Sequence, residues 1–101
     1  MILEHADIRI HAGQQAAFEQ AVLHGLDTVL SRANGFRRYE VRHSIESPER
    51  YVLLIHWDTL EAHTVGFRES PAYAEWRGIV SQFFAQPPVV EHFAAVGASA
   101  A

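Results

Sequence analysis

The chain has 101 residues, 49% of them hydrophobic and 11% aromatic, which suffices for one domain with a packed core. It contains no cysteine, and all eight basic residues are arginines. These absences exclude disulfides, thiolate metal sites, cysteine nucleophiles, lysine Schiff bases and the lysine-dependent phosphate loop. The net charge is −4 and the arginines are mostly scattered, so we expect no nucleic-acid partner.

The N-terminal residues show no basic segment followed by an apolar stretch, so no signal peptide is visible. No apolar run approaches the roughly 20 residues that a membrane-spanning helix requires. We therefore expect a cytoplasmic protein without a membrane partner.

The first third of the chain predicts a strand followed by a helix. Residues 2–11 alternate between two faces, as in a strand. The residues that share one of these faces are Ile2, Glu4, Ala6, Ile8 and Ile10. After Gly13, apolar residues recur at helical spacing. This stripe consists of Ala17, Phe18, Ala21, Val22, Leu26, Val29 and Leu30. The pair at 34–35, Asn-Gly, ends the helix because both residues tolerate a left-handed backbone.

Two strands are predicted next, at residues 36–45 and 51–57, and the turn at 46–49 should join them as an antiparallel hairpin. One face of the first strand carries Tyr39, Val41, His43 and Ile45. The second strand is apolar on both faces, as expected of a central strand that is covered on both sides.

The last third predicts two helices and a strand. Asp58 and Glu61 have the spacing of a capping box for a short helix. Ser70 and Pro71 open a longer helix as its N-cap and first helical residue. The predicted buried stripe of that helix is Tyr73, Trp76, Val80 and Phe83. Two prolines at 87–88 end it, and residues 89–96 form the final strand.

The element order βαββαβ predicts a ferredoxin-like α+β fold with an antiparallel sheet, as one domain over residues 1–96 and a flexible tail at 97–101. Helices can cover only one face of such a sheet. Because the central strand is apolar on both faces, we expect a homodimer in which two sheets pack against each other.

The seven histidines raise the question of a metal site. Two His-x-Asp pairs, at residues 5–7 and 56–58, each place a histidine and a carboxylate on one strand face. This spacing could begin a two-histidine, one-carboxylate iron site, but the sequence shows no third ligand. Half-buried polar histidines on strand faces are the alternative, and we predict no metal.

Other common catalytic motifs are missing. The glycines never form Gly-x-Gly, no Gly-x-Ser-x-Gly elbow exists, and no pair of glycosidase acids can be identified. What remains is a small α+β domain rich in histidine and aromatic residues. This composition favours a pocket for an aromatic or otherwise apolar small molecule.

The segment YVLLIHWDTLEAH at 51–63, with the later Phe67, Ser70, Tyr73 and Trp76, resembles the antibiotic biosynthesis monooxygenase superfamily. The Gly-Gln helix entry at 13–14, the Asn-Gly-Phe turn at 34–36 and the closing Val-Glu-His-Phe at 90–93 resemble it as well. The resemblance covers about residues 1–95. It implies a ferredoxin-fold dimer whose sheets form a dimeric α/β-barrel, and it is more specific for fold than for activity.

The resemblance also implies site residues. In the polyketide-tailoring members, a histidine of the second strand lies in the substrate cavity, and His43 matches it. A tryptophan that closes the third strand corresponds to Trp57, and an arginine of the last helix corresponds to Arg77. Two polar positions differ, because His63 replaces a tyrosine and Leu53 replaces an asparagine.

The haem-degrading branch of the superfamily fits less well. Its asparagine, tryptophan and histidine correspond to Ala6, Phe67 and Arg77, so none is retained. The resemblance therefore favours the members that need no cofactor.

Oxygenation without a cofactor requires a substrate that can itself donate electrons, such as a phenolate or enolate. The enzyme supplies a base, a cation for the oxyanion and a dry cavity. We expect His43 or His63 as the base and Arg77 as the cation. Substrate-binding residues are expected at the pocket wall: Leu53, Trp57, Phe67 and Tyr73.

Each of these residues also has a simpler interpretation. Trp57 and Tyr73 can be plain core, His63 a surface histidine and Arg77 the partner of a nearby acid. The predicted function is a cofactor-independent monooxygenase that acts on a quinol, phenol or polyketide-like aromatic. The alternatives are an isomerase or lyase that acts on a small oxygenated metabolite, and a non-catalytic dimeric binding or stress protein.

Overall fold

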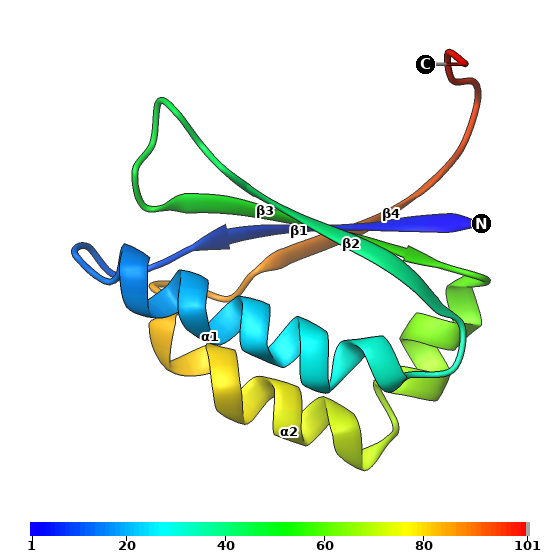
Figure 1. The fold of residues 1–101 in the computed structure, drawn as a ribbon, viewed down its shortest axis with the longest axis horizontal. Helices are drawn as coiled ribbons and strands as arrows, with labels where there is room; N and C mark the ends of the chain where they lie inside the picture. Colours follow the sequence, from blue (N-terminus) through cyan, green and yellow to red (C-terminus); the bar gives the residue numbers. More distant parts are fainter. Residues whose placement is uncertain (101) are drawn as a thin grey trace.

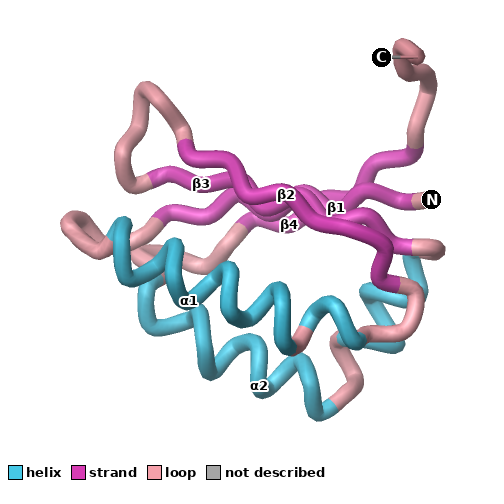
Figure 2. Tube along the Cα trace, viewed as in Figure 1, coloured by secondary structure: helices cyan, strands magenta, loops and turns pink. Residues whose placement is uncertain are grey.

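The computed structural model describes residues 1–100 and places all helices on one side of a single antiparallel sheet (Figure 1). In chain order the elements are β1 (Ile2–Arg9), α1 (Gln15–Thr28), η1 (Leu30–Arg32), β2 (Phe36–His43), β3 (Arg50–Trp57), η2 (Ala62–Phe67), α2 (Pro71–Val80), η3 (Ser81–Phe83) and β4 (Val89–Ala94). The sheet order is β2-β3-β1-β4. This arrangement is the ferredoxin-like α+β fold, and it confirms the predicted fold class (Figure 2).

The alternation predicted for the first strand is present. Every second residue of β1 from Glu4 to Ile8 is buried against the helices, and Ile10 continues this pattern beyond the strand. Antiparallel pairing places Glu4 opposite Ile55 of β3 on one side and His92 of β4 on the other. A carboxylate therefore lies on the covered face of the sheet, on one of its two inner strands.

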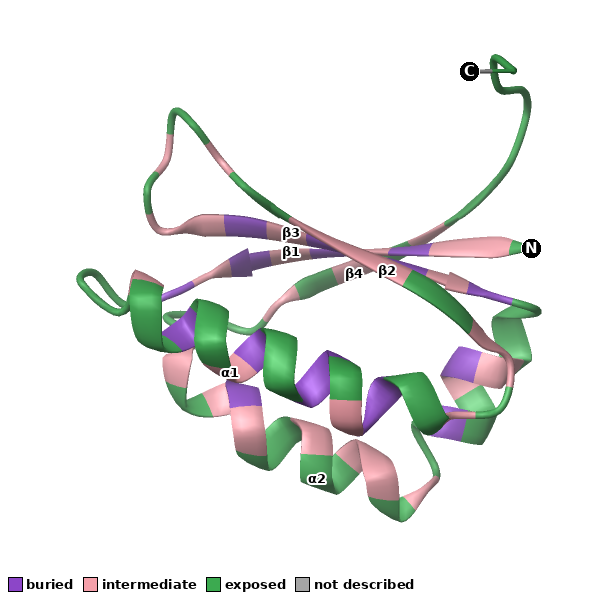
Figure 3. Cartoon of the chain, viewed as in Figure 1, coloured by how far each residue is buried: buried purple, intermediate pink, exposed green. Residues whose placement is uncertain are grey.

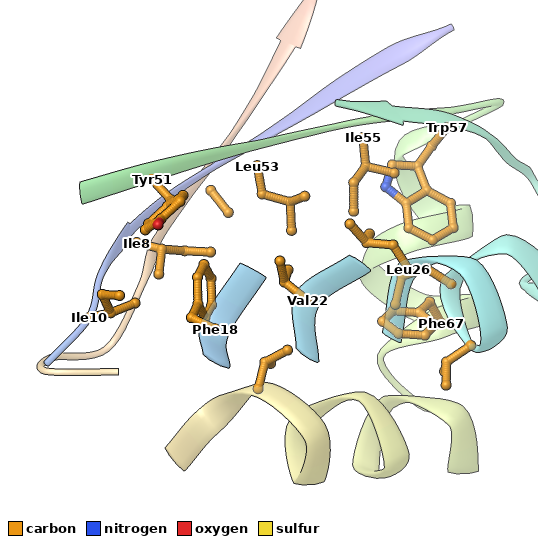
Figure 4. Close-up of a cluster of buried hydrophobic side chains, with 14 residues drawn as sticks. Ile8, Ile10, Phe18, Val22, Leu26, Tyr51, Leu53, Ile55, Trp57 and Phe67 are labelled. Atoms are coloured by element: carbon orange, nitrogen blue, oxygen red, sulfur yellow. The ribbon is translucent and has the colours of Figure 1, made fainter. Parts of the chain in front are cut away.

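The core lies between α1 and the sheet. Phe18, Val22 and Leu26 of α1 are at most 1% exposed and point toward the side chains of β3 (Figure 4). Buried β3 residues alternate along the strand from Tyr51 to Trp57. Figure 3 shows α1 buried along its sheet-facing side, whereas α2 is mostly intermediate or exposed.

The two helices approach each other closely at Gly25. A Cβ atom at this position would lie 2.8 Å from a ring carbon of Trp76 on α2. The absence of a side chain at Gly25 thus lets the indole of Trp76 rest against the backbone of α1.

The start of the helix that follows β3 differs from the prediction. The hydroxyl of Thr59, and not the carboxylate of Asp58, accepts the backbone N–H of Ala62. Asp58 instead forms an ion pair with Arg37. The segment then continues as the π-helix η2, which carries His63 and Phe67 as its buried residues.

Some predicted boundaries were wrong by a few residues. β2 ends at His43, and Ile45 lies beyond it with 92% of its surface exposed. Gly35 has φ of +85°, but Asn34 does not adopt a left-handed backbone. Ser70 occupies the N-cap of α2 as predicted, yet its hydroxyl donates back to the carbonyl of Phe67.

The C-terminal segment has no regular secondary structure from residue 95 to residue 100. Residue 101 of the predicted tail lies outside the described residues. Over residues 1–100, no helix combines the length and the apolarity that crossing a membrane requires.

Candidate active site

A cavity of about 630 Å³ lies between the sheet and the segment that runs from η2 to the start of β4. Its walls are largely apolar, with aromatic rings from Phe67, Tyr73, Trp76 and Phe84. Four ionisable side chains also line it: Glu4, His63, Arg68 and Arg77. This combination of apolar walls and a few converging polar groups is typical of small-molecule sites.

Glu4 is the deepest of the ionisable groups, with 6% of its surface exposed. Its Oε1 atom accepts a hydrogen bond from the indole Nε1 of Trp57 at 3.0 Å. Burial raises the pKa of Glu4 from 4.5 to about 7, although the Trp57 hydrogen bond and the nearby Arg68 oppose the shift. Near neutral pH this carboxyl group therefore exchanges a proton readily.

His63 lies beside Glu4 and is equally enclosed. Its Nε2 atom is 3.3 Å from Oε1 of Glu4, and its Nδ1 atom is 2.8 Å from Nε2 of His92. The imidazole stacks on Trp57, with 5.2 Å between ring centroids. Burial first, and then Arg68 and His92, lower the pKa of His63 to about 4, so this ring is neutral at physiological pH.

Two arginines lie where the cavity meets solvent, since both are exposed residues that line it. Within residues 1–100, neither Arg68 nor Arg77 has a carboxylate partner within 4 Å. Arg77 lies over the ring of Tyr73, 6.0 Å from its centroid. Both guanidinium groups are thus available to a negatively charged ligand atom.

The structure brings five of the seven predicted site residues to this cavity. They are Leu53, His63, Phe67, Tyr73 and Arg77. Trp57 is fully buried behind the wall, where it donates a hydrogen bond to Glu4 and stacks on the lining residue His63.

His43 does not line the cavity. It is exposed at the end of β2, where it stacks on Tyr51 and its Nε2 lies 2.8 Å from the carbonyl oxygen of Pro48. The position belongs to the far end of the sheet from Glu4, because β2 pairs His43 with Tyr51 and not with Ile55.

Three ionisable residues of the site, Glu4, Arg68 and His92, were not predicted as site residues from the sequence, nor were the lining rings of Trp76 and Phe84. Glu4 did carry a signal, because it is a carboxylate on the otherwise apolar face of the first strand. A buried carboxylate needs partners, and the structure supplies them from Trp57 of β3 and His63 of η2. Arg68 carries no comparable pattern.

The two His-x-Asp pairs do not converge. Asp7 is held by Arg50 and Asp58 by Arg37. Within residues 1–100, no group of three histidine, aspartate or glutamate side chains is arranged to hold a metal ion.

Comparisons with known proteins agree with this fold. The family model for antibiotic biosynthesis monooxygenase matches residues 1–78. The uncharacterized protein YczJ of Bacillus subtilis is 36% identical over 93 residues, which cover 92% of this chain and 97% of YczJ.

Solved structures give the same result. A Bordetella bronchiseptica protein named for the antibiotic biosynthesis monooxygenases has a TM-score of 0.89 and 39% identity, over 94% of this chain and 96% of that one. A variant of SnoaB, a cofactor-independent oxygenase from Streptomyces nogalater, has a TM-score of 0.82 over 99% of this chain and 97% of that one. Its identity of 15% supports the fold alone.

Proposed function

The chain belongs to the antibiotic biosynthesis monooxygenase family, and from this premise we propose that it is a cofactor-independent monooxygenase of phenols, quinols or polyketide-like aromatics. The observation that carries the proposal is the cavity of about 630 Å³, which has aromatic walls and a buried Glu4–His63 pair. Two arginines that have no carboxylate partner among residues 1–100 also line it. One or more fused rings fit such a volume.

The chemistry requires only what these residues supply. Loss of a proton turns an anthrone or a hydroquinone into an electron-rich anion that can pass electrons to oxygen. An anthrone and one O₂ then give an anthraquinone and one water. The Glu4–His63 pair provides the base, and Arg77 with Arg68 holds the oxyanion. The apolar rings of Phe67 and Tyr73 exclude water around the anion.

The test is oxygen consumption by purified, metal-free protein with a panel of hydroquinones and anthrones. We expect uptake of one O₂ per anthrone and an Arg77→Gln variant that is roughly tenfold to a hundredfold slower. His24→Gln, at an exposed histidine of α1 that does not line the cavity, is the matched control and should retain full activity.

A panel without any oxygen uptake would contradict the proposal. If the same aromatics still bind, and Arg77→Gln weakens their binding, the cavity serves an isomerase, a lyase or a binding protein.

We also propose that the working unit is a homodimer joined through the uncovered face of the sheet. Two large apolar side chains of β4, Val89 and Phe93, are 56% and 47% exposed there. A second copy would cover this apolar surface.

The dimer is tested by light scattering at micromolar concentration. We expect twice the chain mass for the native protein and a shift toward the monomer for Phe93→Glu. Ile45→Glu, at an exposed position outside the sheet, is the control. A native protein that scatters as a monomer would contradict the proposal.

A further inference from the structure

The sequence favours a histidine as the base, but the geometry around His63 leaves it without a free ring nitrogen. Nε2 is 3.3 Å from Oε1 of Glu4, and Nδ1 is 2.8 Å from Nε2 of His92. A substrate in the cavity would have to displace one of these neighbours to reach a basic nitrogen. His63 is therefore placed to pass a proton along and not to take it from the substrate.

Glu4 has the free atom that His63 lacks. Its Oε1 faces both Trp57 and His63, whereas Oε2 has no hydrogen-bond partner in the part of the chain that the structure describes. Glu4 lines the cavity, and Oε2 is not among the atoms buried without a partner. The carboxyl group thus presents one oxygen to the protein and one to the ligand space.

His92 forms the other end of this chain of contacts. It lies on β4, the edge strand of the sheet, directly opposite Glu4 in the strand register. It is only partly buried and does not line the cavity. The contacts Glu4–His63–His92 therefore lead from the cavity to the edge of the molecule.

We propose that Glu4 takes the substrate's proton at Oε2 and that His63 and His92 form the route by which this proton reaches solvent. The inference rests on the proposed function. The substrate's O–H or acidic C–H bond breaks, and a new O–H bond forms on Glu4. The carboxyl group then rotates so that its protonated oxygen faces His63 and gives this proton to Nε2 of that ring. The Nδ1 proton of His63 passes to His92 and from there to water. One proton leaves, and no electron moves in these steps.

The electrostatic setting agrees with this division of roles. Glu4 has a pKa of about 7 because it is buried, so it can accept and release a proton near neutrality. The pKa of His63 is about 4, so that ring carries a proton only transiently. Arg68 is the charged group that acts on both residues, and His92 also acts on His63.

The first test uses 4-nitrophenol, a phenol whose ionised form absorbs visible light, and needs no oxygen chemistry. We expect wild-type protein at pH 7 to hold this probe as the phenolate and Glu4→Gln to hold roughly tenfold less of it in that form. Glutamine keeps the size of the side chain and an oxygen acceptor for Trp57. His63→Gln, which leaves the carboxylate in place, should still hold the phenolate.

Two results would overturn the assignment of Glu4. One is an equal phenolate fraction in the wild type and in Glu4→Gln, and the other is a wild-type protein that holds the probe only as the neutral phenol. His24→Gln is again the matched control. Because the measurement involves no oxygen, it decides this inference even if the proposed oxygenase activity fails.

The second test addresses the route to solvent. With a substrate that consumes oxygen, His92→Ala should lower turnover about tenfold, and added imidazole should restore it by replacing the missing ring. A purely structural role for His92 would give a loss that imidazole does not repair. Unchanged turnover in His92→Ala would contradict the route as well.

Discussion

The two long helices cover the same face of the sheet in different ways. Three large side chains of α1, Phe18, Val22 and Leu26, are at most 1% exposed and fill the space beneath β3. On α2 only Val80 is buried, and Tyr73 and Trp76 are partly exposed side chains that line the cavity. The sheet thus has a packed half under α1 and a hollow half near α2.

The difference shows how one small domain separates stability from ligand binding. Complete burial of aromatic and branched residues under α1 supplies the free energy of folding. Beside α2, aromatic rings and polar groups face the cavity, so a ligand can pack against them and bind to them. Four predictions test this comparison, from the largest expected effect to the smallest.

The first prediction compares one aromatic side chain from each half. Phe18→Ala should lower the free energy of unfolding by about 3–5 kcal/mol, because it opens a cavity in a fully packed region. Tyr73→Ala should cost only about 1–2 kcal/mol, because its ring already borders empty space. Urea denaturation of both variants measures the two losses. Equal losses would contradict the division into a packed and a hollow half.

The second prediction concerns the ionisable groups of the hollow half. The folded protein holds an extra proton on Glu4 between pH 4.5 and about 7, so this group favours folding at low pH. Its contribution is lost as the pH rises through 7, up to about 3 kcal/mol. His63 acts in the opposite sense, and its contribution rises between pH 4 and 6.5.

The two contributions oppose each other between pH 4.5 and 6.5, where their ranges overlap. The free energy of unfolding of the wild type should therefore change little over this range. In Glu4→Gln only the His63 contribution remains, so stability should rise with pH from 4 to 6.5. Guanidinium denaturation at pH 4.5 and pH 8 measures this. The prediction is contradicted if the free energies of unfolding of the wild type and of Glu4→Gln differ by the same amount at pH 4.5 and at pH 8.

The third prediction concerns the contact between the helices. Gly25→Ala should cost about 1–2 kcal/mol, because the new Cβ displaces the Trp76 ring and the gain in helix propensity offsets only part of the loss. The displaced ring should also weaken the binding of aromatic ligands. Gly78→Ala on α2, where a Cβ meets nothing within 4 Å, is the control and should stabilise the protein. An equal change in melting temperature for Gly25→Ala and Gly78→Ala would contradict the role of Gly25.

The smallest effect is expected where η2 begins. Thr59→Ala should cost about 1 kcal/mol through the loss of the hydroxyl that accepts the N–H of Ala62. Asp58→Ala removes only an exposed ion pair with Arg37, and it should cost less than 1 kcal/mol. Chemical denaturation of the two variants compares them. If Asp58→Ala loses more stability than Thr59→Ala, the result would support the Asp58–Glu61 capping box that the sequence predicts.

Most elements could be predicted because periodicity reports directly on which face is buried. The alternation around Ala6 and Ile8 and the stripe from Phe18 to Leu26 each indicated one element and one buried face. Cap residues were less predictable, since Asp58 and Thr59 are adjacent and both suit a helix start. The choice depended on Arg37, which lies 21 residues away along the chain and competes for Asp58.

The candidate site was predictable only in part. The resemblance supplied His63, Phe67 and Arg77 because these positions follow recognisable local motifs. His43 also followed from it, but it lies at the far end of the sheet. Glu4 stands out in the sequence only as a carboxylate on an apolar strand face, and His92 has no local signature. Their position opposite each other depends on the register between β1 and β4.

The amino-acid sequence by itself determined the element order, the covered face of the sheet and an apolar interior large enough for one domain. The absence of cysteine and lysine also excluded thiol and amine nucleophiles and left histidine, carboxylate, arginine and hydroxyl groups. Only the tertiary structure decided which of these groups meet. Residues 4, 63 and 92 are far apart along the chain, and burial changes their proton affinities only after strand pairing and helix packing have brought them into one dry space.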